Sequence, residues 1–112
     1  MRVISIVDDD ESLRRSVRNL LTSVGFHVET FASAEDFLQS AHREDTGCLV
    51  LDLLAHLVAT DSRIPAVVLT ALSDDEARRR TLRAGAVAFL GKPFHGDALL
   101  GAVRSALAED KR

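Results

Sequence analysis

The sequence has little cysteine and no long apolar run, and each shortage excludes a class of protein. Its one cysteine, Cys48, lies within an apolar stretch, so we expect a reduced core residue and no disulfide framework. This usage is typical of a reducing compartment, and we expect a cytoplasmic protein. No segment approaches the roughly 20 apolar residues that cross a bilayer, so no membrane contact is expected. The apolar part of the N-terminal MRVISIVDDD is too short for a signal peptide.

The sequence also lacks a surplus of positive charge. It has 14 lysine and arginine residues against 17 aspartate and glutamate residues, which gives a net charge of −3. Such a balance would not neutralise phosphates, so we do not expect the chain itself to bind nucleic acid. Lysine is particularly scarce. Lys111 lies in the polar tail, which leaves Lys92, in the motif GKPF, as the lysine in the body of the chain.

Apolar residues, in contrast, are plentiful, at 46% of the chain. A chain of 112 residues with this share can enclose one hydrophobic core, so we expect a single domain over residues 1–112. The polar residues 108–112 resemble the start of an interdomain linker.

Short apolar runs predict five strands. Four of them are nearly continuous in apolar character, which is typical of parallel strands covered on both faces: residues 2–7, 48–53, 66–72 and 86–90. Residues 27–31, HVETF, alternate between polar and apolar side chains and suit an edge strand.

Helical periodicity fills the segments between these strands. The longer helices are predicted over residues 13–24, 34–41, 73–85 and 99–107. Their ends carry capping signals: Ser33 as an N-cap, Ser73 and Glu76 as a capping box, and Gly25 and Gly85 as C-terminal residues. Strands that alternate with helices predict an α/β protein with a doubly wound parallel sheet.

Two expectations concern residues outside these signals. The helix over 73–85 is rich in arginine and offers few residues to the core, namely Ala77, Leu82 and Ala84, so we expect it to be loosely held. The four histidines are expected at the surface or at its boundary: His27, His42, His56 and His95.

Polar residues end four of the five predicted strands. Three aspartates, 8–10, follow the first strand, Asp52 ends the third, Thr70 ends the fourth and Lys92 follows the fifth. Since ligands of such sheets bind beyond the carboxyl ends of the strands, these side chains should converge. Carboxylates held close together favour a hard cation such as Mg²⁺. Asp52 could then act as a nucleophile toward phosphorus, with Lys92 and Thr70 contacting the phosphoryl oxygens.

The segments that carry these residues resemble one known family. IVDDDESLR, CLVLD, RIPAVVLT and RAGAVAFLGKPF are similar, in this order and over nearly the whole chain, to the receiver domain of bacterial two-component response regulators, and most similar to its FixJ-like branch. The resemblance implies a flavodoxin-like sheet of five parallel strands in the order 2-1-3-4-5. It also implies a signalling domain that accepts a phosphoryl group from a sensor histidine kinase and is not an enzyme.

The resemblance assigns a role to each residue of the predicted site. Asp52 would be the phosphoacceptor, and Asp8 and Asp9 would bind Mg²⁺ together with it. Lys92 would contact the phosphoryl group, and the Lys92–Pro93 peptide bond is usually cis in this family.

The resemblance also implies a switch. Thr70 would be the switch hydroxyl and Phe89 a rotating aromatic side chain. Phosphorylation would change the face formed by the fourth helix, the fifth strand and the fifth helix. The output would be homodimerisation through that face or control of a DNA-binding domain outside this chain, which makes the chain part of a transcription regulator.

The chain departs from the family after Asp52. Receivers usually carry a loop of the kind R-M-P-x-M-x-G there, whereas here the sequence LLAHLVATDSRIP follows, about ten residues short and close to the minimum of about a dozen for a parallel crossover. We expect a short helix over 54–60. The backbone carbonyl of Leu54 would be the remaining Mg²⁺ ligand, and a helix that starts at once would turn it away. Three explanations of the difference stay open: a natural deletion, a deliberate shortening of the chain, or loop residues that the sequence omits.

Two other functions are open on the sequence alone. A receiver that has lost phosphorylation could act as a protein-interaction module, which the missing loop favours and the retained polar residues oppose. The spacing Asp8-x-Asp10 after the first strand also suits an aspartate-based phosphatase, although 112 residues leave no room for the usual cap of such enzymes.

Overall fold

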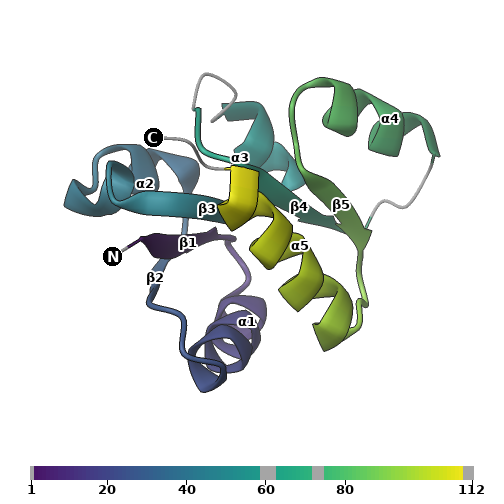
Figure 1. Ribbon diagram of the computed structural model, residues 1–112. Coiled ribbons are helices and arrows are strands. Elements are labelled where there is room, and N and C mark those ends of the chain that lie inside the picture. Colours follow the sequence, from purple (N-terminus) through teal and green to yellow (C-terminus); the bar gives the residue numbers. More distant parts are fainter. Residues whose placement is uncertain (1, 59–62, 72–74, 110–112) are drawn as a thin grey trace.

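The computed structural model describes residues 2–58, 63–71 and 75–109 (Figure 1). One parallel sheet contains the five strands β1 (Val3–Val7), β2 (Val28–Phe31), β3 (Thr46–Asp52), β4 (Ala66–Thr70) and β5 (Ala88–Gly91). Their spatial order is β2-β1-β3-β4-β5, which confirms the predicted doubly wound, flavodoxin-like topology. The helical segments are α1 (Glu11–Ser23), α2 (Ala34–Leu38), η1 (Ala41–Arg43), α3 (Leu53–Val58), α4 (Asp75–Arg83) and α5 (Gly96–Glu109).

Helices cover both faces of the sheet, with α1 and α5 on one side and α2, α3 and α4 on the other (Figure 1). Alternate residues of β3 supply the two cores. Cys48 and Val50 pack with residues of α1 and α5, whereas Leu49 and Leu51 pack with residues of α2 and α3. Burial on both faces explains why the strand sequences are almost continuously apolar. Cys48 is fully buried and reduced, as predicted.

The structure confirms several predicted caps and shifts some boundaries. The Ser33 hydroxyl accepts the N–H of Asp36 and begins α2, and Gly25 and Gly85 have the positive φ angles of 98° and 105° that favour glycine after a helix. The second helix is shorter than predicted, because Ala41 belongs to the separate helix η1. Ser73, proposed to cap the fourth helix, lies outside the described residues.

Strand β3 begins at Thr46, two residues before the predicted start. Thr46 is fully buried, and its hydroxyl shares a hydrogen bond of 2.7 Å with the hydroxyl of Ser5 in β1. A buried hydroxyl needs such a partner. Ser5 lies 41 positions away in the chain, so local sequence does not reveal the pairing.

Helix α4 faces the core with Ala77, as predicted, and with Thr81, which was not predicted. Thr81 is its buried residue, and Ala77 packs half-buried against the same core, whereas Leu82 is 37% exposed and Ala84 is exposed. Residues four apart share one helix face, which places Thr81 above Ala77. The Thr81 hydroxyl donates to the Ala77 carbonyl at 2.7 Å, so its burial leaves no polar group unsatisfied.

The connection after β3 is compact. Helix α3 covers Leu53–Val58 and begins directly after the last residue of β3, one residue before the predicted start; residues 59 and 60 of the helix predicted over 54–60 lie outside the described residues. In the part of the chain that the structure describes, no helix has the length and apolar character needed to cross a membrane.

Candidate functional site

The polar residues at the ends of the strands meet at one edge of the sheet, as predicted. Asp8 directly follows β1, Asp52 is the last residue of β3, Thr70 is the last of β4, and Lys92 directly follows β5. The parallel register pairs Asp52 with Leu69 and Thr70 with Gly91, so the four strands end at a similar height. Their carboxyl ends therefore form one site.

Three carboxylates form a cluster at this edge. Each of Asp8, Asp9 and Asp52 offers an oxygen, and these oxygens lie within 4.8 Å of one another. Asp8 is buried, Asp52 half-buried and Asp9 exposed. The carboxylates adjoin a hollow of about 220 Å³, whose wall includes the side chains of Leu54 and Val58. Three like charges this close are stabilised by a cation, and oxygen donors in this number suit Mg²⁺.

Asp8 is the most constrained of the three. One carboxylate oxygen accepts the backbone N–H of Asp10 at 2.9 Å, and the other lies 3.2 Å from the ammonium of Lys92. The guanidinium of Arg14 donates to the Asp8 carbonyl at 2.6 Å. The Lys92 backbone N–H donates to the carbonyl of Thr70 at 2.7 Å, which ties the end of β5 to β4. The Lys92–Pro93 bond is cis, as the resemblance implies.

Asp10 has a different role from its two neighbours. Its Oδ1 accepts the backbone N–H groups of Ser12 and Leu13, at 3.0 and 3.2 Å, which makes it the N-cap of α1. The run of three aspartates thus divides into two candidate metal ligands and one helix cap. The position directly before a helix is the sequence signal for that division.

Asp52 both ends β3 and caps α3. Its Oδ1 accepts the backbone N–H of Ala55 at 2.7 Å, and its Oδ2 has no hydrogen-bond partner among the residues described. Burial raises the pKa of the Asp52 carboxyl, and the nearby charges of Asp8 and Asp9 raise it further. The bond from Ala55 and the charge of Lys92 act in the opposite direction. The site therefore holds a partly desolvated carboxylate.

Leu54 lies inside α3, with its side chain 73% exposed on the wall of the acidic hollow. Carbonyls of an α-helix point toward its C-terminal end. In that direction the Leu54 carbonyl points away from Asp52, which disfavours it as a Mg²⁺ ligand. Coordination of Mg²⁺ by the Leu54 carbonyl stays a prediction.

Thr70 and Phe89 lie on the same face of the sheet. Phe89 pairs with Val68 and Gly91 pairs with Thr70, and residues two apart in a strand point to the same side. Phe89 packs in the core cluster that also contacts Ala77 of α4. Both side chains are buried, Thr70 at 6% and Phe89 at 4% exposure. Thr70 and Phe89 therefore both lie on the face of the sheet that α4 covers.

The expectation that His56 lies at the surface or at its boundary is wrong. It is 6% exposed, burial lowers its pKa, and its Nε2 atom is buried without a hydrogen-bond partner in residues 2–58, 63–71 and 75–109. The available signal was its place in an apolar helix, LLAHLV, where one face must pack on the sheet.

Comparison with known proteins agrees with this geometry. The sequence model of the response regulator receiver domain matches residues 4–104. Nodulation protein W of Bradyrhizobium diazoefficiens is 38% identical over 120 residues, which cover 98% of this chain and 53% of that protein. The transcriptional regulatory protein FixJ of the same organism is 34% identical, with 95% and 57% covered. This chain thus spans about half the length of the curated relatives it matches.

Solved structures show the same likeness. The FixJ-N crystal structure is 34% identical with a TM-score of 0.82, over 97% of this chain and 95% of that one. The response regulator StyR is 42% identical with a TM-score of 0.82, over 97% of this chain and 60% of that one. The match to nodulation protein W is longer than the 112 residues present here, so it includes positions that this chain lacks. The chain belongs to the response regulator receiver domain family and to its FixJ-like branch.

Proposed function

We propose that Asp52 accepts a phosphoryl group from a sensor histidine kinase in a Mg²⁺-dependent reaction. Receiver domains of two-component response regulators are signalling domains of this kind. The observation that carries the proposal is the convergence of Asp8, Asp9 and Asp52 at one sheet edge, with Lys92 beside them. Carboxylates alone would repel a phosphoryl donor, whereas this site also contains the positive charge of Lys92.

The carboxylate oxygens of Asp8, Asp9 and Asp52 fit Mg²⁺, since they are hard donors close enough to share one ion. When bound, the ion would offset negative charge on the carboxylates and on the incoming phosphoryl oxygens. Few protein ligands are needed, because Mg²⁺ keeps several waters in most protein sites.

In the proposed step, Asp52 Oδ2 attacks the phosphorus of the kinase phosphohistidine. The new O–P bond forms as the P–N bond breaks, and the electron pair of that bond stays on the imidazole nitrogen. The hydrogen bond from Ala55 to Oδ1 orients the carboxylate and leaves Oδ2 for the attack. Lys92 lies next to Asp8 and would contact a phosphoryl oxygen, with the Thr70 hydroxyl donating to another.

The phosphoryl group would carry a charge of about −1.5 to −2 in place of the single negative charge of the carboxylate, and this difference would change the face formed by α4, β5 and α5. Support for this switch comes from the shared face of Thr70 and Phe89 and from the sparse anchoring of α4, whose described residues include one buried side chain, Thr81. The output would be homodimerisation through this face or control of a transcriptional output domain. FixJ, a curated relative about twice as long as the matched region, is a transcriptional regulatory protein.

Phosphorylation with acetyl phosphate tests the proposal. We expect the chain to gain one phosphoryl group, measured by intact mass, when acetyl phosphate and Mg²⁺ are both present. Asp52→Asn should gain none, and the matched control Asp97→Asn, at an exposed aspartate in the first turn of α5, should gain as much as the wild type. Undiminished incorporation into Asp52→Asn would refute the assignment of the phosphoacceptor.

A further inference from the structure

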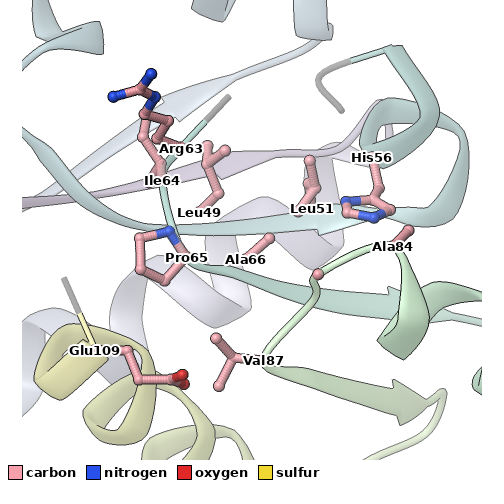
Figure 2. A pocket seen from close by; sticks show the side chains of 11 residues that line it. Leu49, Leu51, His56, Arg63, Ile64, Pro65, Ala66, Ala84, Val87 and Glu109 are labelled. Atoms are coloured by element: carbon pink, nitrogen blue, oxygen red, sulfur yellow. The ribbon is translucent and has the colours of Figure 1, made fainter. Parts of the chain in front are cut away.

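Hollows of similar size on this molecule differ in the charge of their walls. The hollow of about 210 Å³ that Figure 2 shows has one arginine and one glutamate in its lining, Arg63 and Glu109. Another hollow, of about 200 Å³, lies between helix α1 and strand β2 and has three arginines. It is lined by Glu11, Arg14, Arg15, Arg18 and Thr30. This hollow therefore has an excess of positive charge.

The excess is local, because the chain as a whole has a net charge of −3. Three arginines and one glutamate leave two positive charges in excess at the hollow. Glu11 is already paired with Arg15 at 3.2 Å, and both of these side chains are largely exposed. The charges of Arg14 and Arg18 are therefore not paired with a carboxylate of the lining.

Helix geometry brings Arg14 and Arg18 together. Residues four apart lie on the same face of a helix, with Cβ atoms about 5–6 Å apart. The Nη1 of Arg14 donates to the Asp8 carbonyl at 2.6 Å, which holds this half-buried guanidinium and leaves its other N–H groups for a ligand. Arg18 is exposed, and its guanidinium has no hydrogen-bond or ion-pair partner among the residues described. Two guanidinium groups can therefore act on one anion.

Strand β2 adds a hydroxyl to the same hollow. Thr30 lies two residues after Val28, so both side chains point to the same face of the sheet. Val28 packs against the core cluster that contains Val17 and Leu21 of α1, which places Thr30 on the α1 side. Thr30 is exposed, and its hydroxyl can donate a hydrogen bond to an anion that the arginines hold.

The donor set favours phosphate over other anions. A guanidinium matches two oxygens of a phosphate, and such charge-assisted hydrogen bonds are stronger than bonds between neutral groups. A phosphate monoester carries about −1.5 to −2 at neutral pH, which balances the two positive charges in excess. A volume of about 200 Å³ is below the roughly 300 Å³ of the smallest usual ligand pockets, so the organic part of the ligand must be small.

We propose that this hollow binds a small phosphate monoester as its dianion. Arg14 and Arg18 would contact phosphate oxygens, and the hydroxyl of Thr30 would donate to another. Glu11 would limit the affinity, because its carboxylate repels the dianion. The site uses none of the side chains proposed for phosphoryl transfer and does not depend on phosphorylation of Asp52.

Titration of the 112-residue chain with glycerol 3-phosphate, followed by amide and arginine Nε NMR, tests the proposal. Mg²⁺ is left out, so that the acidic cluster does not attract the phosphate. We expect saturable shifts at Arg14, Arg18 and Thr30, and none with glycerol or acetate. The affinity should fall severalfold on acidification to about pH 5, because the dianion takes up a proton near pH 6 whereas arginine stays charged. Equal binding of acetate, or no saturable shifts with the phosphate, would overturn the proposal.

Substitutions separate a specific site from general attraction to positive charge. Arg18→Gln should weaken the binding of glycerol 3-phosphate about fivefold, and Thr30→Val about threefold, because each removes one donor at an exposed position. The matched control Arg104→Gln, at an exposed arginine of α5, should bind like the wild type. Equal losses in Arg18→Gln and Arg104→Gln would show adventitious attraction only and would refute the site.

Two further measurements complete the test. Glu11→Gln should bind glycerol 3-phosphate about threefold more tightly than the wild type, a gain that damage to the fold would not produce. An unchanged or lower affinity in this variant would contradict the placement of the anion beside Glu11. A peptide with a central phosphoserine that bound more tightly than glycerol 3-phosphate would assign the hollow to a phosphorylated protein segment and overturn the small ligand.

Discussion

The backbone N–H of Ala55 donates a 2.7 Å hydrogen bond to the carboxylate of Asp52, so the proposed phosphoacceptor is also the N-cap of α3. The two roles are joined because the helix begins at the residue after the strand. A modification of Asp52 would therefore act directly on the start of α3. Substitutions at this position can separate the effect of the charge from that of the cap.

We expect Asp52→Asn to be more stable than the wild type near neutral pH. Asparagine keeps the acceptor oxygen for Ala55 and removes a charge that burial disfavours. Asp52→Ala loses the cap as well and should be about 1 kcal/mol less stable than Asp52→Asn. Urea unfolding followed by far-UV circular dichroism measures both differences.

The advantage of Asp52→Asn should depend on pH. Because the folded state raises the pKa of Asp52 above 3.8, it holds the proton more tightly than the unfolded state. The resulting stability is complete below pH 3.8 and is lost as the pH rises through the raised value. The difference between variant and wild type should shrink on acidification toward pH 3.8, and a constant difference would contradict this explanation.

The three neighbouring aspartates should differ in their effect on Mg²⁺ binding. Asp8→Asn and Asp9→Asn each remove a candidate ligand, and we expect each to weaken Mg²⁺ binding at least about tenfold. Asp10→Asn retains the acceptor that caps α1 and is the matched control, with affinity close to that of the wild type. The chain has no tryptophan or tyrosine, so calorimetry or amide NMR is the suitable measurement. Equal losses in all three variants would indicate only a general effect of negative charge.

Removal of Lys92 should destabilise the chain through Asp8. Asp8 is 3% exposed and the Lys92 side chain 27% exposed, so the pair is largely buried. We expect Lys92→Met to lower the free energy of unfolding by about 1–2 kcal/mol, less than for a fully buried pair because water still reaches Lys92. Mg²⁺ should restore stability to this variant, since the ion replaces the missing positive charge.

A double-mutant cycle isolates the Asp8–Lys92 interaction. If the loss in Lys92→Met arises from an unpaired buried carboxylate, adding Asp8→Asn to it should recover most of the lost stability. Additive effects of the two substitutions would show that Lys92 stabilises the chain by another route.

Acidification below pH 6.5 should destabilise the chain through His56. Burial lowers its pKa from 6.5, so the unfolded state binds the proton more readily. Stability is complete above pH 6.5 and is lost as the pH falls through the lowered value. Charged residues also line the two hollows that His56 borders. Arg80 lines the hollow on the α4 side, and Arg63 and Glu109 line the other, so the surroundings of His56 contain two positive charges and one negative charge.

Unfolding free energies measured between pH 5 and pH 8 test this dependence. His56→Leu should flatten the curve in this range. The matched control His95→Gln, at an exposed histidine, should retain the slope of the wild type. An unchanged slope in His56→Leu would assign the dependence to another group.

Much of the fold could be read from the sequence. The continuous apolar runs identified the parallel strands, because strands covered on both faces need apolar side chains on both sides. The expected convergence of Asp8, Asp52, Thr70 and Lys92 also followed from the chain, since parallel strands bring their carboxyl ends to one edge. These features depend on periodicity and topology, which the sequence expresses directly.

The roles of individual side chains required the tertiary structure. Three adjacent aspartates look alike in the sequence, whose periodicity predicts the helix only from residue 13, and the observed start of α1 at Glu11 identifies Asp10 as the cap. Thr46 pairs with Ser5, which is distant in the chain, so the start of β3 depends on a contact that no local pattern encodes.

The segment after Asp52 shows the same division. The sequence by itself determined that this connection is short and that Asp52 ends a strand. Only the folded chain decided that α3 starts at Leu53, that Asp52 caps it, and that His56 is buried beside a hollow. The physical reason is that length and polarity are properties of the chain, whereas burial and hydrogen bonding depend on what packs around each residue.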